Sequence, residues 1–425
     1  MLFAPDSVPG LRRIFQQRRN RLLSLVVATG LAGGLVGAGY LGLLALVTRG
    51  LGPDRWSLPA HLVVLAAVGL AVAGLTRWLG NPADVELLVD NIHVLGGADE
   101  VRSLRSLVPV SLLCIGAGGA LGPEAPLVTT TGTLGSWLGG RARLGREDLR
   151  IVSIAGMAAG FTVLFGAPLG SAVFALEILH RRGLEYYEAL LPSAIGALCG
   201  YAVYAGITGL GLEPVFAFPE VGPVRLADLG WGAAAGVVGA GVAYAFTYLC
   251  AALRWAVVAV PASARPVLGG LVLGGLAFAT PYALTNGEAQ ITDLTAAHTA
   301  VATLAVAAAA KLLASAVSLV TGWKGGFIIP LFFVGYCLAR ASAGSLPGSD
   351  EWVLAAALMV ACNVGVTKTP LGSTLVVTEM AGLAVLPSTL LAAVVSLALT
   401  SGVGLIDSQR RRFDASDDVD EPGTP

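Results

Sequence analysis

The chain carries few charges for its length. Charged residues make up only 12% of its 425 residues, whereas hydrophobic residues make up 55%. A soluble globular domain carries about 25% charged residues. This shortage of charge excludes an ordinary soluble protein and directs attention to the long apolar runs, which include residues 22–47, 229–253 and 301–320, the last broken only by Lys311.

These apolar runs are long enough to cross a membrane. About 20 helical residues span a hydrocarbon core roughly 30 Å thick. Backbone groups in lipid must be satisfied internally, so only helices and closed barrels cross it. The runs are continuous rather than alternating, which excludes a barrel. We predict an all-α polytopic membrane protein with roughly 14 to 18 helical pieces, some of them short or broken.

Metal-ligating side chains are scarce as well. The four histidines are scattered, and the five cysteines lie singly in apolar stretches, at Cys114, Cys199, Cys250, Cys337 and Cys362. None has the paired spacing of a metal or redox motif, so buried free thiols are expected. The sequence suggests no metal site and no cofactor.

Arginine gathers at the ends of the apolar runs. The clusters comprise Arg12, Arg13, Arg18, Arg19, Arg21, Arg141, Arg143, Arg146, Arg150, Arg181, Arg182, Arg410, Arg411 and Arg412. The positive-inside rule assigns such segments to the cytoplasm. A secretory signal at the start is disfavoured, because the apolar stretch is too long and lacks a clear cleavage site. We expect a plasma-membrane protein with both termini in the cytoplasm.

Two stretches of the chain resemble each other. The first contains GPEAP at 122–126, PLGS at 168–171 and Glu177, and the second contains GFIIP at 326–330, PLGS at 370–373 and Glu379. In both, a glutamate follows the proline of PLGS by nine residues. Many transporters are built from inverted-topology repeats, with broken helices holding the substrate near the midplane. We therefore predict two inverted-topology repeats with broken and re-entrant helices.

The repeat sets the domain boundaries. A Pro/Gly-rich linker at 209–224 separates a first membrane repeat (22–208) from a second (225–406). A cytoplasmic N-terminal segment (1–21) precedes them, and a polar, disordered cytoplasmic tail (407–425) follows. No soluble domain is expected at either end.

Glu124 is the strongest candidate functional residue. It lies between Pro123 and Pro126 in the stretch GAGGALGPEAPLV at 116–128. Proline is tolerated in the first helical turn but not in the interior, so a helix should begin near Glu124 inside the membrane. Its unsatisfied N–H groups and positive dipole end would form an anion site, which the carboxylate could occupy as a tethered anion. The plainer reading is a helix cap.

The second repeat has the same device without the acid. The flexible stretch GWKGG at 322–326 precedes an apolar helix start, where the amides of Phe327 and Ile328 would face an ion. Glycines allow the backbone to approach an ion closely. Lys324 would either draw anions to this turn or extend to the membrane interface.

This pattern resembles the CLC family of chloride channels and chloride–proton antiporters. The family's GxExP motif with its gating glutamate matches residues 122–126, its GGxFxP-type motif matches 325–330, and its FNAPLAG-like stretch matches 165–171 through Glu177. The resemblance covers most of residues 22–406 and implies a CLC-like homodimer in which each subunit has its own pore. It implies a divergent prokaryotic-type member with a gate at Glu124 and anion-binding backbone at Gly122, Pro123, Ala125, Gly325, Gly326, Phe327 and Ile328.

The chain departs from the family in four places. Pro123 replaces the usual basic residue before the gating glutamate. The family's serine motif has no clear copy, and Asn81 in GNPAD at 80–84 is the nearest candidate ligand. No tyrosine follows Tyr336 to supply the family's late ligand, and the inner proton relay falls on Ile178. The adjacent Glu177 is a candidate relay, against a structural role in capping or in pairing with the arginines after it.

The resemblance favours passive or gated movement of chloride or a similar anion. Proton-coupled exchange, with chloride, fluoride or another small anion, is the alternative. A membrane enzyme such as a polyprenyl-phosphate phosphatase is a remote third possibility, because it needs clustered intramembrane acids. Deep apolar sequence carries acids only at Glu124, Glu177 and Glu379, one per segment.

Overall fold

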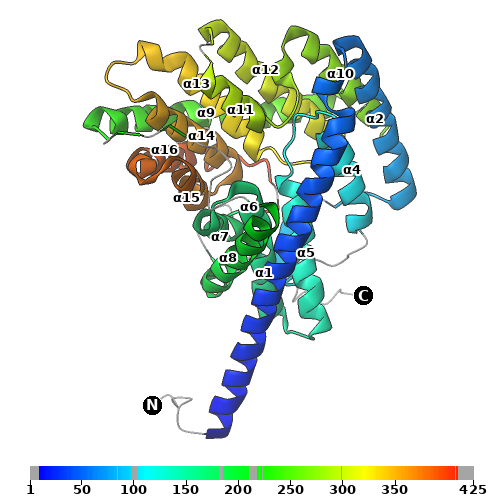
Figure 1. Ribbon diagram of the computed structural model, residues 1–425, viewed down its shortest axis with the longest axis vertical. Helices are drawn as coiled ribbons and strands as arrows, with labels where there is room; N and C mark the ends of the chain where they lie inside the picture. Colours follow the sequence, from blue (N-terminus) through cyan, green and yellow to red (C-terminus); the bar gives the residue numbers. More distant parts are fainter. Residues whose placement is uncertain are drawn as a thin grey trace, which may run out of the picture.

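The described chain is almost entirely helical (Figure 1). The computed structural model describes residues 9–83, 85–97, 103–180, 185–209, 218, 219, 221, 222, 224–297, 299–406, 408 and 409. Within them lie the helices α1 (Pro9–Leu51), α2 (Leu58–Leu79), α3 (Val85–Val94), α4 (Leu104–Gly116), α5 (Glu124–Arg141), α6 (Arg146–Phe165), α7 (Pro168–Glu177), α8 (Leu190–Thr208), α9 (Leu226–Ala256), α10 (Arg265–Ala279), α11 (Glu288–Ala296), α12 (Val301–Val320), α13 (Ile328–Ser342), α14 (Glu351–Thr367), α15 (Pro370–Ala381) and α16 (Leu386–Thr400). These sixteen helices confirm the predicted number of helical pieces.

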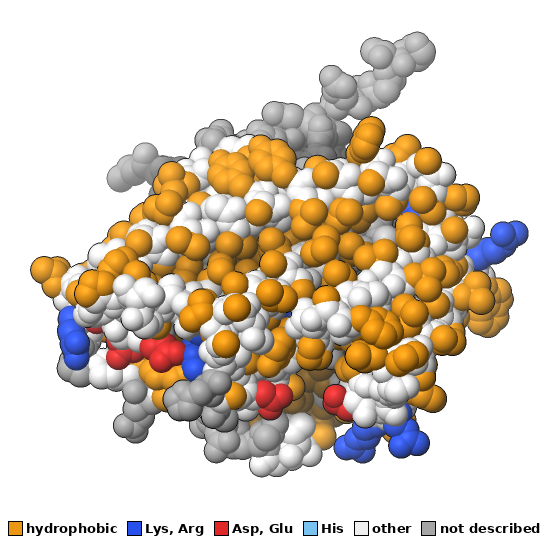
Figure 2. Space-filling model, turned by 90° about the horizontal axis from the view of Figure 1, so that it is seen from above, with side chains coloured by type: hydrophobic (Ala, Val, Ile, Leu, Met, Phe, Trp, Pro, Cys, Tyr) orange, Lys and Arg blue, Asp and Glu red, His pale blue; other side chains and the backbone are white. Residues whose placement is uncertain are grey.

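Among the described residues, eight helical segments are long and apolar enough to cross a membrane. They are Gln17–Arg55, Leu58–Leu79, Arg146–Phe165, Tyr187–Thr208, Leu226–Ala256, Val301–Val320, Ile328–Ser345 and Leu383–Thr400. Other helices are shorter; α7 and α15 have 10 and 12 residues. The face in Figure 2 is dominated by hydrophobic side chains, and charged ones gather along its lower edge. A lipid-facing exterior accounts for this surface, so the chain is an integral membrane protein.

The two halves pack in the same pattern. In the first half α6 packs against α1, α5 and α8, and in the second α14 packs against α9, α13 and α16. Contacts between the halves join α2 to α10 and α7 to α15. The helices of the two GPEAP- and GFIIP-bearing stretches therefore hold equivalent places, as the sequence repeat predicts.

The two central helices are buried along nearly their whole length. In the apolar window of α6, 94% of residues are buried, and every residue of α14 from Val353 to Thr367 is buried. Both helices are rich in alanine and contain glycine, and such small residues let neighbouring helix backbones approach closely within a membrane. Phe165 of α6 and Phe332 of α13 meet where the halves join, with ring centroids 6.2 Å apart. This rigid centre supports the loops that precede α5 and α13.

The short helices α7 and α15 cap each other. Glu177, at the end of α7, accepts hydrogen bonds from the amides of Leu371 (3.2 Å) and Gly372 (2.6 Å) in the first turn of α15. In return, Glu379 of α15 accepts from the amides of Leu169 (3.0 Å) and Gly170 (3.3 Å) in α7. A carboxylate on a helix N-terminus satisfies unpaired amides and complements the dipole. The exchange is reciprocal, as expected for antiparallel elements of two inverted halves.

Several segments singled out in the sequence are outside the described residues. These are residues 1–8, most of the linker 209–224, the tail apart from Ser408 and Gln409, and the arginines at 181 and 182. Helix α1 begins at Pro9, within the segment 1–21, and the candidate span begins at Gln17.

Candidate functional site

The N-termini of α5 and α13 meet at the centre of the molecule. The Gly122 amide donates to the Gly326 carbonyl (2.8 Å), and the Gly326 amide donates to the Gly122 carbonyl (2.6 Å). This antiparallel bridge joins the two turns that precede the helices. Helix α5 begins at Glu124 and α13 begins at Ile328, as the proline positions predict. Two positive helix ends thus converge on one point.

The Glu124 side chain occupies the N-terminus of the opposite helix. Its Oε1 atom accepts a hydrogen bond from the Ile329 amide in the first turn of α13 (2.5 Å). The residue is 1% exposed, and within the described residues its Oε2 atom has no hydrogen-bond partner. The carboxylate therefore sits where the helix end would bind an anion.

Gly122 and Gly326 create the space for this carboxylate. A Cβ atom added at either position would clash with the carboxylate of Glu124. Only glycine leaves room for a charged group this close to both backbones. The requirement explains why both GxxxP motifs begin with glycine.

Neighbouring helices hold the two turns in place. Ser315 of α12 donates to the Ala120 carbonyl (2.8 Å), and the Trp323 indole donates to the Pro266 carbonyl (2.9 Å). On the other side, the Asn363 amide of α14 donates to the Ile328 carbonyl (3.4 Å). Irregular backbone within a membrane is tolerated where protein surrounds it in this way.

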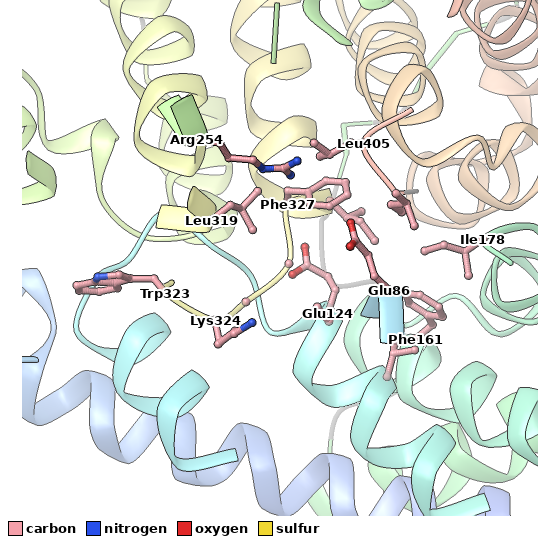
Figure 3. A pocket seen from close by; sticks show the side chains of 16 residues that line it. Glu86, Glu124, Phe161, Ile178, Arg254, Leu319, Trp323, Lys324, Phe327 and Leu405 are labelled. Carbon is pink, nitrogen blue, oxygen red and sulfur yellow. The ribbon is translucent and has the colours of Figure 1, made fainter. Parts of the chain in front are cut away.

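A pocket of about 220 Å³ opens beside Glu124 (Figure 3). It is lined by Glu86, Glu124, Ala125, Val128, Phe161, Ile178, Arg254, Leu319, Trp323, Lys324, Gly325, Gly326, Phe327, Ile328, Leu405 and Ile406. The lining combines the backbone of the turn before α13 with apolar side chains and four charged ones. A small anion fits such a space.

The structure brings most of the predicted site residues together. Ala125, Gly325, Gly326, Phe327 and Ile328 line the pocket with Glu124. Gly122 and Pro123 lie in the turn beneath, where Pro123 is the residue before the first turn of α5. Lys324 is half-buried and also reaches the pocket.

Two predicted residues lie elsewhere. Asn81 is exposed between α2 and α3 and does not line the pocket. Glu177 is engaged with the N-terminus of α15, while its neighbour Ile178 lines the pocket wall. The two side chains point apart because successive helical residues are about 100° apart.

The sequence reasoning missed several residues of the wall, among them Glu86, Arg254, Leu405 and Ile406. Leu405 and Ile406 come from the segment after α16, and no motif marks them. Glu86 follows the GNPAD stretch by two residues, in the first turn of α3. Arg254 lies in the last turn of α9, where a basic residue ordinarily signals a helix end. The acid at Glu86 and the base at Arg254, each next to an apolar run, were the only features of the sequence that could have marked this wall.

A family model described as "Voltage gated chloride channel" matches residues 89–401. The chain is 29% identical over 379 residues to a chloride/fluoride channel protein of Pseudomonas syringae pv. tomato, covering 83% of this chain and 79% of the relative. It is 31% identical over 373 residues to a ClcB-like chloride channel protein of Ralstonia nicotianae, covering 79% and 82%.

Solved structures share the fold. A CLC-type fluoride/proton antiporter superposes with a TM-score of 0.79 at 20% identity, covering 92% of this chain and 98% of that chain. A slow cyanobacterial Cl⁻/H⁺ antiporter superposes with a TM-score of 0.78 at 21% identity, covering 90% and 95%. The predicted fold, an all-α bundle of two halves with broken helices, is confirmed.

Proposed function

The chain belongs to the voltage-gated chloride channel family, and on this premise we propose that it passes chloride or a similar small anion without proton coupling, with Glu124 as the gate. Members of the family are ion channels or transporters rather than enzymes. The proposal covers the ion, the gate and the lack of coupling; anion transport itself follows from the family.

One observation supports the proposal that Glu124 is the gate. The Glu124 carboxylate accepts the Ile329 amide at the N-terminus of α13, which is the position an anion would take. A tethered carboxylate and a free anion compete for the same amides, so the site is closed while Glu124 is seated. Neutralising the acid removes the competitor and leaves the helix end available.

The anion ligands in this proposal are mainly backbone groups. The start of α13 supplies the amides of Phe327 and Ile328, and the start of α5 supplies the amide of Ala125 opposite them. The amides of Gly122 and Gly326 bond each other's carbonyls, and Pro123 has no amide hydrogen. The described lining holds no serine, tyrosine or asparagine side chain, and Ile178, Leu405 and Ile406 form an apolar wall. We therefore propose that backbone amides do the work of the family's side-chain hydroxyls.

We further propose that the protein is a homodimer in the plasma membrane, with both termini in the cytoplasm. The arginine clusters before the first apolar run and after the last support this orientation. Residues from both halves of the chain, from Glu86 to Ile406, surround the pocket, which supports one pathway per subunit.

The test of the gate is Glu124→Gln in proteoliposomes. Flux of chloride, fluoride, nitrate and sulfate is compared for the two proteins between acid and neutral pH. Wild-type flux should rise as pH falls, because protonation neutralises the gate, whereas the glutamine variant should be open and insensitive to pH. A well-folded variant with wild-type flux and pH response would sink the proposal.

Proton-coupled exchange is the second candidate, and Glu86 is the observation in its favour. Glu86 gives the pocket a second titratable carboxylate besides Glu124. Coupled movement needs such a relay, because a bare proton in hydrocarbon is prohibitively costly. Internal pH is followed under an imposed chloride gradient at clamped voltage. Uphill proton movement that Glu86→Gln abolishes would favour this candidate over the uncoupled one.

A further inference from the structure

The pocket has an exposed end and a buried end. Glu86 and Arg254 are both exposed, whereas Glu124 and Ile328 are buried. All four line the same pocket. An anion that enters from the exposed end therefore passes Glu86 and Arg254 before it reaches the helix ends at Glu124.

The two charged residues of this mouth lie on different walls. Glu86 comes from the first turn of α3, and Arg254 comes from the last turn of α9. Figure 3 shows the carboxylates of Glu86 and Glu124 pointing into the same space, with Arg254 reaching it beside Phe327 and Leu405. The surrounding wall is apolar, formed by Leu319, Leu405 and Ile406.

Charges at such a mouth act on every ion that enters. A cleft with low-dielectric walls focuses the field and changes the local concentration of a charged substrate. A guanidinium is always protonated, so Arg254 contributes a positive charge at any physiological pH. The ionised carboxylate of Glu86, on the other wall, contributes a negative charge. Occupancy of the mouth by an anion then depends on the sum of the two.

We propose that Arg254 and Glu86 set the anion occupancy of the pocket mouth, Arg254 by attracting the anion and Glu86 by opposing it. The inference rests on the proposed anion pathway through this pocket and adds to it the residues that control entry. Neither side chain needs to contact the anion in its central site, because both act through their charge at the pocket mouth.

The experiment measures initial chloride efflux from proteoliposomes at low and high ionic strength, with gluconate as the screening anion. At about 0.01 M the Debye length is about 30 Å, and at about 1 M it is about 3 Å. At the low value Arg254→Gln should reduce efflux roughly 3- to 10-fold, and Glu86→Gln should increase it by a similar factor. Both effects should disappear at the high value.

Three variants serve as controls. Arg254→Lys keeps the charge and should restore wild-type efflux. The double variant Arg254→Gln with Glu86→Gln should lie between the single variants. Arg77→Gln makes the same change of net charge at an exposed residue of α2 outside the pocket, and should match the wild type.

Four results would overturn the proposal: efflux of Arg254→Gln unchanged at low ionic strength, a reduction that persists at high ionic strength, an equal reduction in Arg77→Gln, or a reduction in Glu86→Gln.

Glu124→Gln is measured in the same experiment. If it changes the pH response while the Arg254 and Glu86 variants behave as the wild type, the mouth proposal fails and the gate remains. If the wild type passes neither chloride nor fluoride, the proposed function itself fails.

Discussion

At the scale of the residue, the site depends on one carboxylate and on the two glycines that make room for it. Glu124 reaches the Ile329 amide only because Gly122 and Gly326 have no side chains to obstruct it. A hydrogen bond between an amide and a charged group contributes about 1.5–3 kcal/mol. The closed state that we propose for Glu124 therefore depends on both glycines.

The Gly326→Ala variant tests whether the position of the Glu124 carboxylate depends on the space that this glycine leaves. The added methyl group displaces the carboxylate, so the closed state should lose roughly 1.5–3 kcal/mol. Anion flux at neutral pH should rise about tenfold or more, and its dependence on pH should weaken. The measurement is flux from proteoliposomes across a pH series. Gly241→Ala in α9, where an added Cβ meets nothing within 4 Å, is the matched control and should behave as the wild type.

Lys311 is a second residue whose role the structure defines. Its Nζ atom donates to the carbonyls of Leu284 (2.5 Å) and Thr285 (2.8 Å) and to the side-chain oxygen of Gln290 (3.0 Å). The side chain is fully buried in α12. It ties α11 and the turn before it to α12, which explains why a lysine interrupts the apolar run 301–320.

Lys311→Met should therefore destabilise the protein. Methionine fills similar space but leaves three acceptors without their donor, each costing about 1–3 kcal/mol. A fall of several degrees in the melting temperature in detergent is expected. Lys324→Met, at a half-buried residue, should have a smaller effect. Equal melting temperatures for Lys311→Met and the wild type would show that the turn does not depend on this lysine.

At the scale of the element, the short helices α7 and α15 are joined by reciprocal capping. Each has a proline in its first turn and a glutamate near its end that accepts amides of the other helix. Helices this short are marginal by themselves. Their stability comes from packing and from these caps, which also fix the position of Ile178 on the pocket wall.

Glu177→Ala and Glu379→Ala should each destabilise this pair. Loss of a helix cap costs about 0.5–2 kcal/mol, and the effect should be larger for Glu177, which is buried. Glu177→Gln keeps an acceptor and should lie between the alanine variant and the wild type. Thermal melting in detergent measures the order, with Asp54→Ala at an exposed site as the control.

Transport by the Glu177→Gln variant separates capping from proton relay. If Glu177 only caps α15, the Glu177→Gln variant should show chloride flux near that of the wild type at equal amounts of protein. Internal pH should then respond to an imposed chloride gradient in the same way for both proteins. Loss of uphill proton movement in this variant would instead show that Glu177 carries protons.

At the scale of the whole molecule, two halves meet around one pocket. Residues from both halves line the pocket, from Glu86 on α3 to Ile406 after α16. The repeats proposed at 22–208 and 225–406 therefore form one functional unit rather than two.

Subunits in a homodimer should accordingly work independently. Mixed dimers of wild-type and Glu124→Gln subunits, separated by two affinity tags, should show the mean of the fluxes of the two parent dimers. Native mass measurement in detergent checks that two copies are present. A mixed dimer whose flux matches either parent alone would indicate a shared pathway.

The sequence by itself determined the fold class, the repeat and the two helix starts at the candidate site. Low charge and long apolar runs require helices, because lipid leaves no other partner for the backbone. Paired prolines and glycines around Glu124 and Phe327 mark helix starts through local sterics, which need no tertiary information. These features are local in the chain, and the structure has both helix starts at the predicted places.

Only the tertiary structure decided which residues complete the pocket. Glu86, Arg254 and Leu405 come from distant segments, and nothing in their local sequence distinguishes them from helix-end residues or ordinary apolar ones. The same holds for Asn81, which lies near Glu86 in the chain yet outside the pocket. Glu177 and Glu379 likewise acquire their role from the antiparallel packing of α7 on α15. Contacts between segments far apart in sequence depend on how helices pack, and that packing is a property of the folded chain as a whole.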